Sequence, residues 1–428
     1  MVRHTVLLIL DGAADRPVDG KTPLSEAYTP GLDRLAQNAV CGFHYPVAPG
    51  IAPESDLATI SLLGYVPEKY YTGRGPLEAL GIGLTIKQGY EVAFRANFAT
   101  IDPATRRIID RRVGRSLGSE EARELARALD GMQLGQDGYA VVRATIGHRA
   151  VVVIGSRNQR LSAAVSNIDP AYVRKGLISE AVKNPEMVLP RCRPLEDTEE
   201  ARRTCEMVDE FVDKAIEVLE AHPVNAERAN KGLLKANAIL LRDAGDRIPE
   251  MPPISKQLGL SPAAAIAEMP VEIGIARAAG MKPYMVSPPS GDLARDLPER
   301  LEAMLKALKD GNGFVYVHLK GPDEPGHDGD FEGKKKAIEL IDKHFVSPLL
   351  DHIDLDEVAI IVTSDHATPW SLKSHSGDPV PWMLSWGEIP DGPGEFSEIA
   401  CKRRGSQVLE HGWLLLPYVM EFIRKRAQ

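Results

Sequence analysis

Cysteine is scarce in this chain, with 4 residues among 428. The cysteines lie far apart and include no CxxC pair, which argues against a zinc ribbon and against a dithiol redox motif. They are Cys41, Cys192, Cys205 and Cys401. We therefore expect reduced thiols, as is usual for a cytoplasmic protein.

Long apolar runs are also missing, and no segment approaches the length of a transmembrane helix. The apolar stretch near the start ends in Asp11-Gly12 and lacks a small-residue cleavage site, so it is predicted to be a β-strand and not a signal peptide. Internal repeats and low-complexity segments are absent as well. We expect no association with a membrane.

Positive charge is not in excess, because the formal net charge is −9. This balance disfavours nonspecific binding to nucleic acid or to an anionic membrane, while a local basic pocket could still bind an anionic metabolite. A hydrophobic content of 43% with 26% charged residues fits a soluble globular protein of two or three domains, or one domain with a large insertion. Nothing in the sequence indicates an oligomeric state.

Three apolar runs end abruptly in residues that can bind a metal. Residues 5–10, 314–319 and 358–363 have no polar alternation, which predicts strands buried on both faces of a sheet that helices cover. In such α/β folds, ligands bind beyond the carboxyl ends of the strands. The polar residues that follow the three runs are Asp11, then Asp323 and His327, then Asp365 and His366, with His375 on the loop beyond.

This mixture of carboxylate and imidazole side chains suits Zn²⁺, Mn²⁺ or Fe²⁺ better than Ca²⁺ or Mg²⁺ alone. Five or six such ligands are too many for a single tetrahedral ion. Two ions about 3.5–4 Å apart could hold both the attacking and the leaving oxygen of a phosphoryl transfer. The set therefore predicts a two-metal site, although each residue alone could be a strand-end cap or a surface loop residue.

Ser55 stands at the predicted start of a helix, because Leu57, Ile60 and Leu63 follow it at helical spacing. One interpretation is an N-cap serine, whose hydroxyl would accept a hydrogen bond from the first turn. The other is a nucleophile, whose phosphorylated form the helix N-terminus would stabilise. The stretch alone leaves both open.

The pattern changes after about residue 86 to that of an α+β unit. We predict a strand over 90–100, a hairpin over 140–154 that turns at Gly147-His148, a long amphipathic helix from about Thr198, and a strand over 235–242. From Ser261 the α/β pattern returns, with a predicted helix over 263–278, a strand over 281–286 and a helix over 296–308.

Five segments together resemble the archaeal type of cofactor-independent phosphoglycerate mutase, within the alkaline phosphatase superfamily. The resemblance runs nearly end to end, and one departure is Glu54, where the family is expected to have glycine. The segments are Leu-Asp11-Gly, Glu-Ser55-Asp-Leu-Ala-Thr-Ile-Ser-Leu-Leu-Gly, Gly-Pro-Asp323-Glu-Pro-Gly-His327-Asp-Gly-Asp, Ser-Asp365-His366-Ala-Thr-Pro and Ser-His375-Ser-Gly-Asp-Pro-Val-Pro.

The resemblance implies an α/β fold with a doubly wound, mostly parallel sheet of alkaline-phosphatase type and an inserted smaller α+β domain. Residues 1–86 and 256–428 would form the metal-binding catalytic domain, and residues 87–255 the inserted domain that clamps the substrate. It also implies isomerisation of 3-phosphoglycerate to 2-phosphoglycerate, a step of glycolysis and gluconeogenesis, without bisphosphoglycerate. Two divalent ions are implied, Mn²⁺ first, with Zn²⁺, Co²⁺ and Mg²⁺ left open.

Carried over to this chain, the family pattern makes Ser55 the nucleophile that becomes phosphoserine. One ion would be bound by Asp323, His327 and His375. The other would be bound by Asp11, Ser55, Asp365 and His366.

A mutase must also retain the glycerate while the phosphoryl group is on the enzyme. We expect arginines to hold the substrate carboxylate and phosphate by bidentate hydrogen bonds. The candidates are Arg74, Arg95, Arg115, Arg149 and Arg242, each of which could instead be a solvated surface residue. Lys320 would neutralise phosphate charge, and His148 or His318 would move the proton between the two hydroxyls.

Two alternatives to a mutase remain at this stage. A metal-dependent phosphomonoesterase would use the same serine and ions but release the phosphate to water. A catalytically silent metal-binding or scaffold protein could keep the fold without the reaction, although the complete set of ligands argues against it.

Overall fold

The computed structural model describes residues 2–405 and 407–427, and these form two compact units. Unit 1 combines Met1–Tyr71 with Glu250–Gln428, and unit 2 is the continuous segment Thr72–Pro249. Among the described helices, none is both long and apolar enough to cross a membrane.

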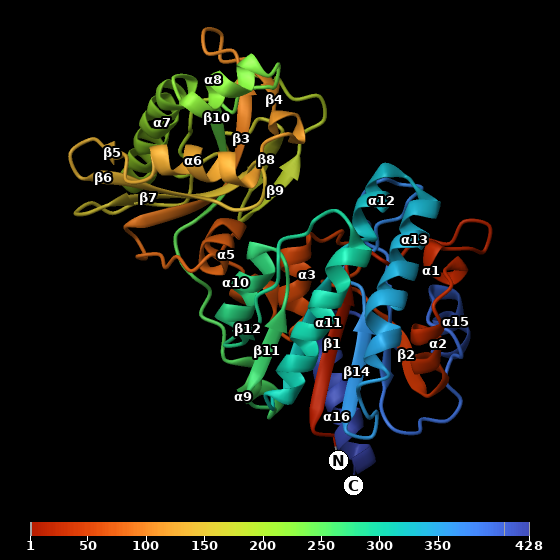
Figure 1. The fold of residues 1–428 in the computed structure, drawn as a ribbon. Helices are drawn as coiled ribbons and strands as arrows, with labels where there is room; N and C mark the ends of the chain where they lie inside the picture. The colour runs from red at the N-terminus through yellow and green to blue at the C-terminus, as the bar shows by residue number, and fades with distance from the viewer. Residues whose placement is uncertain (1, 406, 428) are drawn as a thin grey trace. The chain divides into compact units, whose positions relative to one another are not determined.

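Unit 1 is built on an eight-stranded sheet in the order β12-β11-β13-β1-β14-β15-β2-β16 (Figure 1). The five strands from β12 to β14 run parallel, whereas β15 is antiparallel to both of its neighbours. The strands are β1 His4–Leu10, β2 Ala39–His44, β11 Ala263–Ile266, β12 Lys282–Pro283, β13 Phe314–Leu319, β14 Val358–Thr363, β15 Val380–Ser385 and β16 Gln407–Leu409.

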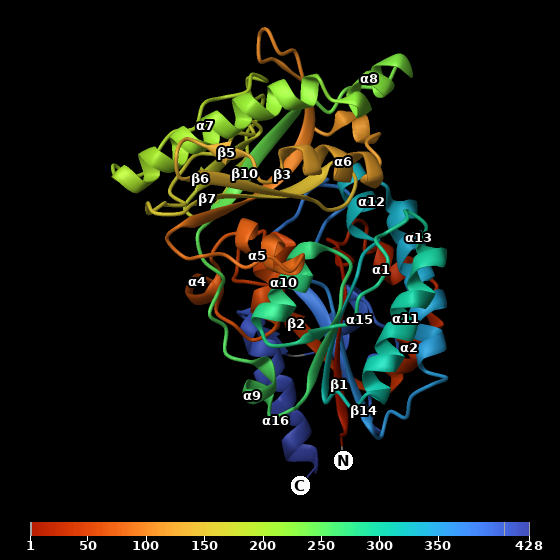
Figure 2. The ribbon, with the colours of Figure 1, turned by 60° about the vertical axis from the view of Figure 1, so that its left-hand side comes forward.

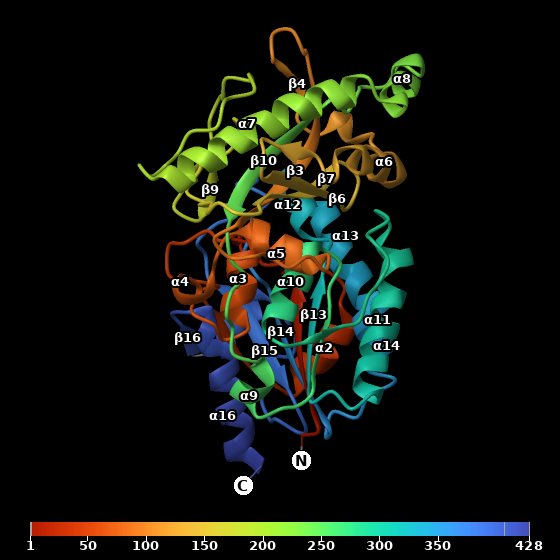
Figure 3. The same cartoon turned by 90° about the vertical axis from the view of Figure 1, so that its left-hand side faces the viewer.

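Helices cover both faces of this sheet, which explains the uninterrupted apolar strands. The α11 helix packs on one side, and α16 lies on the other (Figure 3). The helices of unit 1 are α1 Pro23–Glu26, α2 Pro30–Gln37, α3 Ser55–Leu62, α4 Pro67–Tyr70, α9 Ile254–Leu258, α10 Pro270–Ala278, α11 Leu293–Lys309, α12 Asp323–Asp328, α13 Phe331–Ile341, α14 Ser347–Leu349, α15 Glu398–Arg404 and α16 Leu415–Ala427, with short turns at Asp342–Val346 and Gly412–Leu414. The fold class predicted from the sequence, α/β with a mostly parallel sheet, is confirmed.

The predicted helix over 263–278 is wrong in its first part. Residues 263–266 form β11, which pairs in parallel with β13, and the helix α10 begins only at Pro270. A short apolar run fits a buried strand as well as a helix, and here pairing in the sheet decides. The predicted strand over 281–286 is reduced to Lys282–Pro283.

Unit 2 contains a second sheet, in the order β10-β3-β7-β6-β5, with β4 paired to β3 (Figure 2). One face carries the main core of the unit, with Val92, Phe94, Ala96 and Phe98 packed against residues of α6 and α7. The elements are α5 Arg74–Gly81, β3 Glu91–Ile101, β4 Ile108–Asp110, α6 Ser119–Leu129, β5 Gln133–Leu134, β6 Gly138–Ala144, β7 Arg149–Ser156, β8 Tyr172–Lys175, β9 Ile178–Ala181, α7 Glu199–Glu220, α8 Pro223–Asn230 and β10 Ala238–Gly245, with a short turn at Val113–Arg115.

The two units meet in the chain at Tyr71/Thr72 and Pro249/Glu250, and not at 86/87 and 255/256 as expected. The reason is α5, because Ala79 of this helix packs with Ala93 of β3 and with Val151 and Val153 of β7. Residues 72–86 therefore belong to unit 2, although their Pro/Gly-rich composition resembles the preceding segment.

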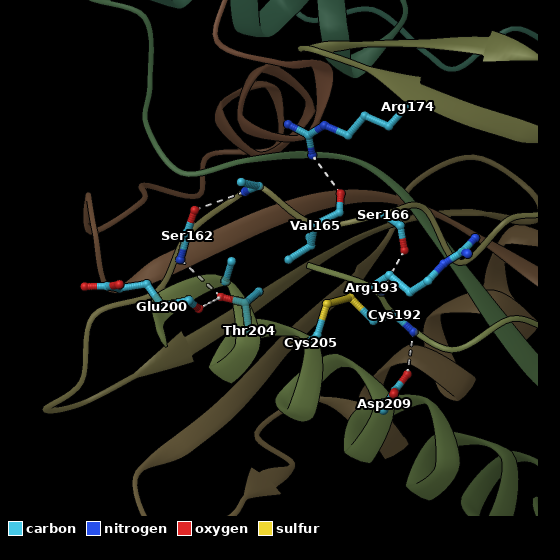
Figure 4. Close-up of a disulfide and its surroundings, with 12 residues drawn as sticks. Ser162, Val165, Ser166, Arg174, Cys192, Arg193, Glu200, Thr204, Cys205 and Asp209 are labelled. Atoms are coloured by element: carbon cyan, nitrogen blue, oxygen red, sulfur yellow. Dashed lines mark hydrogen bonds between the residues drawn. A yellow bond between two sulfur atoms is a disulfide. The ribbon is translucent and has the colours of Figure 1, made fainter. Parts of the chain in front are cut away.

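A disulfide joins Cys192 to Cys205 on α7, in contrast to the expected reduced thiols (Figure 4). The segment before α7 is fixed at the same place by the Cys192 N–H, which donates to Asp209 at 2.9 Å. Cys41 and Cys401 are free and buried, as expected. The pairing could not be inferred from sequence, because the two cysteines are 13 residues apart in no known motif.

Replacing both Cys192 and Cys205 by serine is expected to lower the free energy of unfolding of unit 2 by about 3 kcal/mol, the value for a closed loop of this size. Hydrogen exchange of the α7 amides measures the loss. Reductant should bring the unmodified protein to the same exchange rate and leave the double variant unchanged. Equal exchange with and without reductant would contradict the prediction.

Candidate metal centre and catalytic serine

Three neighbouring strands of unit 1 bring the predicted ligands together at the carboxyl ends of the strands. β1 lies between β13 and β14, with Leu10 opposite Leu319 and Ile9 opposite Thr363. Because the three strands are parallel, the loops that follow them all begin at the same end of the sheet. This register brings Asp11, Asp323 and Asp365 together. Asp11 is more than 300 residues away in the chain from each of the other two.

The first ligand cluster consists of Asp323, His327 and His375. Asp323 and His327 are one turn apart on α12, and the Nε2 atoms of His327 and His375 lie 3.5 and 3.4 Å from the Asp323 carboxylate. The other ring nitrogen of each histidine faces a backbone carbonyl, of Lys373 at 3.2 Å and of Pro53 at 2.8 Å. The Nε2 atoms of both histidines thus point at the same carboxylate oxygen of Asp323.

The second cluster lies deeper and contains Asp11, Asp365 and His366. The His366 Nε2 atom lies 3.4 Å from Asp11 and 3.3 Å from Asp365, and all three side chains are buried. One carboxylate oxygen of Asp11 and one of Asp365 have no hydrogen-bond partner among the described residues. Buried anionic oxygens need such a partner or a cation.

Ser55 is the first residue of α3, and its Oγ lies 3.2 Å from the His366 Nε2. Glu54 occupies the N-cap position, and no side-chain capping bond is formed there. The N-cap interpretation of Ser55 is therefore wrong, because the hydroxyl points into the second cluster and not back to its own helix.

Charge in this region favours a bound cation. Burial lowers the pKa of both His366 and His318, and Lys320 lowers that of His318 further, but the surrounding carboxylates outweigh these effects and raise both pKa values to about 9. Burial would raise the pKa of Asp11, yet the neighbouring Lys320 and the two histidines hold it well below its ordinary value. The donor set fits a divalent metal ion, so the structure supports divalent metal binding at these clusters.

Lys320 is held by two acidic groups beside the second cluster. Its ammonium donates to Glu272 at 2.8 Å and lies 3.0 Å from Asp11. Glu272, in the first turn of α10, was not predicted from the sequence. Its place could not be inferred, since nothing in the local pattern distinguishes a buried glutamate from a solvated one.

A buried lysine connects the loops that follow β1 and β14. The fully buried Lys334 donates to Asp15 at 2.7 Å and to the carbonyls of Ala14 and Thr368 at 2.9 and 2.8 Å. Thr368 in turn donates to Asp323 at 2.7 Å and accepts from His366 at 2.9 Å. Lys334 was not predicted from the sequence, because it lies in a run of three lysines that resembles a solvated helix face.

Arginines gather on one face of the unit 2 sheet. Because side chains alternate along a strand, Arg95 and Asn97 of β3 face the same side as their cross-strand partners Arg242 and Arg149. The apolar part of this face lies under α5. Among the described residues, the Arg95 and Arg242 Nε atoms and the Asn97 carbonyl oxygen have no hydrogen-bond partner. The Arg95 and Arg242 Nε atoms lie 3.6 Å from Glu78 and 3.5 Å from Asp243, so carboxylates balance part of their charge, while the N–H donors without hydrogen bonds favour a polar ligand with acceptor oxygens.

The remaining predicted substrate residues are also in unit 2. Arg74, in α5, donates to Glu78 at 2.8 Å, and Arg95 lies 3.6 Å from the same carboxylate. His148 lies near four arginines, and burial together with Arg149, Arg112, Arg95 and Arg115 lowers its pKa to about 4. The imidazole is therefore neutral at neutral pH.

Arg115 lines an open surface depression of about 480 Å³, which is large enough for a small metabolite. Arg112 is a lining residue that was not among the predicted substrate ligands, although it stands in a visibly arginine-rich segment of the sequence. The lining residues are Ile109, Asp110, Arg111, Arg112, Gly114, Arg115 and Met187.

Comparison with known proteins decides the family. A family model described as 2,3-bisphosphoglycerate-independent phosphoglycerate mutase matches residues 36–225. A protein of that name from Aeropyrum pernix is 50% identical over 420 residues, which cover 97% of this chain and 98% of the relative. The chain belongs to the 2,3-bisphosphoglycerate-independent phosphoglycerate mutase family.

Further relatives and solved structures match over nearly their full length as well. A relative of that name from Archaeoglobus fulgidus is 43% identical over 97% of this chain and 99% of its own. The solved structure of a Pyrococcus horikoshii protein gives a TM-score of 0.76 at 30% identity and covers 99% of this chain and 98% of that chain. The cofactor-independent phosphoglycerate mutase from Thermoplasma acidophilum gives 0.61 at 29% identity, over 98% and 99%. The predicted family is confirmed.

Proposed function

We propose that this protein interconverts 3-phosphoglycerate and 2-phosphoglycerate through a phosphoserine at Ser55, without bisphosphoglycerate. The observation that carries the proposal is the Ser55 hydroxyl, 3.2 Å from His366 within a cluster of buried carboxylates and imidazoles. Membership of a family of phosphoglycerate mutases supports it. The reaction would serve glycolysis and gluconeogenesis in the cytoplasm.

The two clusters suggest a site for two ions, and we propose Mn²⁺ for both. Asp323, His327 and His375 would hold one ion, and Asp11, Ser55, Asp365 and His366 the other. When bound, such ions stabilise the serine alkoxide and neutralise the charge of the phosphoryl group. Carboxylates mixed with imidazoles suit Mn²⁺, Zn²⁺ and Co²⁺.

Ser55 would act as the nucleophile and carry the phosphoryl group at the N-terminus of α3. The N–H groups of a helix's first turn are not used within the helix, so they favour an anionic group there. Lys320 would reduce the negative charge at the site, while its contacts with Glu272 and Asp11 fix its position. The neutral imidazole of His148 would accept the proton of one substrate hydroxyl and return it to the other.

Unit 2 would bind the substrate carboxylate and phosphate. Arg95, Arg149 and Arg242 share one face of its sheet, and orphaned donors on two of them support this role. We include Arg74 and Arg115 in the proposed set. Retention of the glycerate by these arginines would let the phosphoryl group return to the second hydroxyl before water attacks.

Replacing Arg95 by alanine is expected to raise the KM for 3-phosphoglycerate by roughly 10–100-fold, because one charged hydrogen bond to the substrate is worth about 1.5–3 kcal/mol. Steady-state kinetics measures the change. Arg123→Ala is the control, since that exposed side chain contacts only Glu120 of its own helix among the described residues. An unchanged KM in the Arg95 variant would remove this arginine from the proposed set.

The function is tested on the purified protein after chelation, with 3-phosphoglycerate as the substrate. Formation of 2-phosphoglycerate should be lost after chelation and restored by Mn²⁺, at an amount approaching two ions per chain. Release of inorganic phosphate without 2-phosphoglycerate would replace the mutase by a phosphomonoesterase. The absence of both products in the metal-loaded protein would overturn the proposed activity.

A further inference from the structure

His318 is a buried histidine of β13 that the two clusters described above do not include. It is 1% exposed, and its Nε2 atom has no hydrogen-bond partner among the described residues. That atom faces one oxygen of Asp365 at 3.5 Å and one of Asp11 at 3.9 Å. The same two oxygens are themselves without hydrogen-bond partners. The His318 nitrogen and the two carboxylate oxygens therefore lie close together, and none of the three forms a hydrogen bond.

The proposed histidine ligands share one arrangement of their rings. His327 and His375 each face a backbone carbonyl with Nδ1, so Nδ1 carries the proton and the Nε2 lone pair is free. His366 faces the Thr368 hydroxyl with Nδ1, and because that hydroxyl donates to Asp323, it accepts from His366. A bond at Nδ1 that leaves Nε2 free is typical of metal-binding histidines.

His318 has the same arrangement. Its Nδ1 lies 2.8 Å from the hydroxyl of Tyr316, on the same strand, while Nε2 points to the carboxylates. Not every buried histidine of this sheet has a bonded Nδ1 and a free Nε2, as His44 shows. Its Nε2 atom is bonded to the Thr363 hydroxyl at 2.8 Å, and its Nδ1 atom is the one without a partner.

Three of the four distances from His318 and His366 to the carboxylates of the second cluster are close to those expected around one shared ion. Four ligand atoms bound tetrahedrally at about 2.1 Å lie about 3.4 Å from one another. The Nε2 of His366 is 3.4 Å from the Asp11 oxygen and 3.3 Å from the Asp365 oxygen, and the Nε2 of His318 is 3.9 and 3.5 Å from the same atoms. A direct hydrogen bond from His318 would instead require about 2.7–3.2 Å.

We propose that His318 Nε2 is a direct ligand of the ion held by Asp11, Asp365 and His366, with the Tyr316 hydroxyl accepting the proton of Nδ1. The Ser55 oxygen then adds to a set of two carboxylates and two imidazoles. The other ion has one carboxylate and two imidazoles, and His327 is partly exposed. The ion beside Ser55 is consequently the more tightly bound of the two, and its histidine-rich surroundings favour Zn²⁺, Co²⁺ or Mn²⁺ over Mg²⁺.

The inference rests on the proposed function only for the presence of the ions, so its test measures binding and not turnover. Calorimetric titration of the chelated full-length protein with Mn²⁺ gives the affinities of both ions, and titration with Co²⁺ adds the absorption bands of the bound metal. His318→Gln should lower the affinity for one ion by more than about 100-fold and change the Co²⁺ spectrum. Tyr316→Phe keeps His318 but removes the hydroxyl that its Nδ1 faces. It should lower the affinity for the same ion by about 10–100-fold, as expected for the hydrogen-bond partner of a metal-binding histidine.

His4→Gln is the matched control, because the Nδ1 of this histidine also has a hydrogen-bond partner, the Asn312 carbonyl at 2.8 Å, but His4 lies at the opposite end of β1 from Asp11. It should bind both ions as the unmodified protein does. Equal affinities and an unchanged Co²⁺ spectrum in His318→Gln, or a loss no larger than in Tyr316→Phe, would overturn the proposal. If His318→Gln does not fold, His318→Asn takes its place in the same comparison. A protein that binds both ions but shows no mutase activity would contradict the proposed function and leave this ligand in place.

Discussion

Replacement of Ser55 by alanine should abolish the interconversion of the two phosphoglycerates, with kcat reduced by at least about 10⁴-fold, the order of loss expected when a nucleophilic serine is removed. The hydroxyl lies 3.2 Å from His366, and within the proposed mechanism no other group takes the phosphoryl from the substrate. Steady-state assay with Mn²⁺ measures the loss. Mass spectrometry of the enzyme during turnover should detect a phosphoserine in the unmodified protein and none in the variant.

Ser61→Ala is the matched control for this experiment. Ser61 is a buried serine of the same helix, α3, and its hydroxyl has no hydrogen-bond partner among the described residues. Its removal should leave kcat within about twofold. Ser55→Ala should also retain ion binding, because Asp11, Asp365 and His366 remain. Activity of the Ser55 variant within tenfold of the unmodified protein would exclude a phosphoserine at this position.

Replacement of Lys334 by methionine should destabilise unit 1 by about 3–5 kcal/mol. This fully buried ammonium holds Asp15 at 2.7 Å and two backbone carbonyls, and removing one partner of a buried ion pair leaves an uncompensated charge. Urea denaturation followed by tryptophan fluorescence measures the effect on this unit alone. All four tryptophans, Trp370, Trp382, Trp386 and Trp413, lie in unit 1.

The neighbouring Lys335 provides the control, because its ammonium pairs with the exposed Glu332 at 2.7 Å. Lys335→Met should change the free energy of unfolding by less than about 1 kcal/mol, as is usual for surface ion pairs. Activity should fall further in the Lys334 variant than stability alone explains, since the lysine positions the loops that carry Asp11 and His366. Similar denaturation midpoints for the two variants would show that the Lys334 contacts contribute little.

The candidate metal ligands of unit 1 were predictable because their signal in the sequence is local. A strand buried on both faces leaves an apolar run in the sequence, and the first polar residues after it lie at the carboxyl end. Asp11, Asp323 and Asp365 can therefore be identified without knowledge of which strands are neighbours. Parallel pairing of β1 with both β13 and β14 then places them together.

Other features could not be predicted, because they depend on contacts between distant parts of the chain. Glu272 and Lys334 have the composition of surface residues, and only the packing of their helices shows them to be buried. The disulfide between Cys192 and Cys205 depends on how the segment before α7 folds back on that helix. The four residues of β11 are too few to show a period, so that strand was assigned to a helix.

The discontinuous course of unit 1 has a consequence for its biosynthesis. β1 leaves the ribosome well before its two neighbours in the sheet, which lie more than 300 residues later. Unit 2 is continuous and can fold during synthesis, as domains generally do. The nascent chain therefore carries an unpaired apolar strand until β13 and β14 are made, and nascent chains released before His375 should neither bind both ions nor remain soluble without a chaperone.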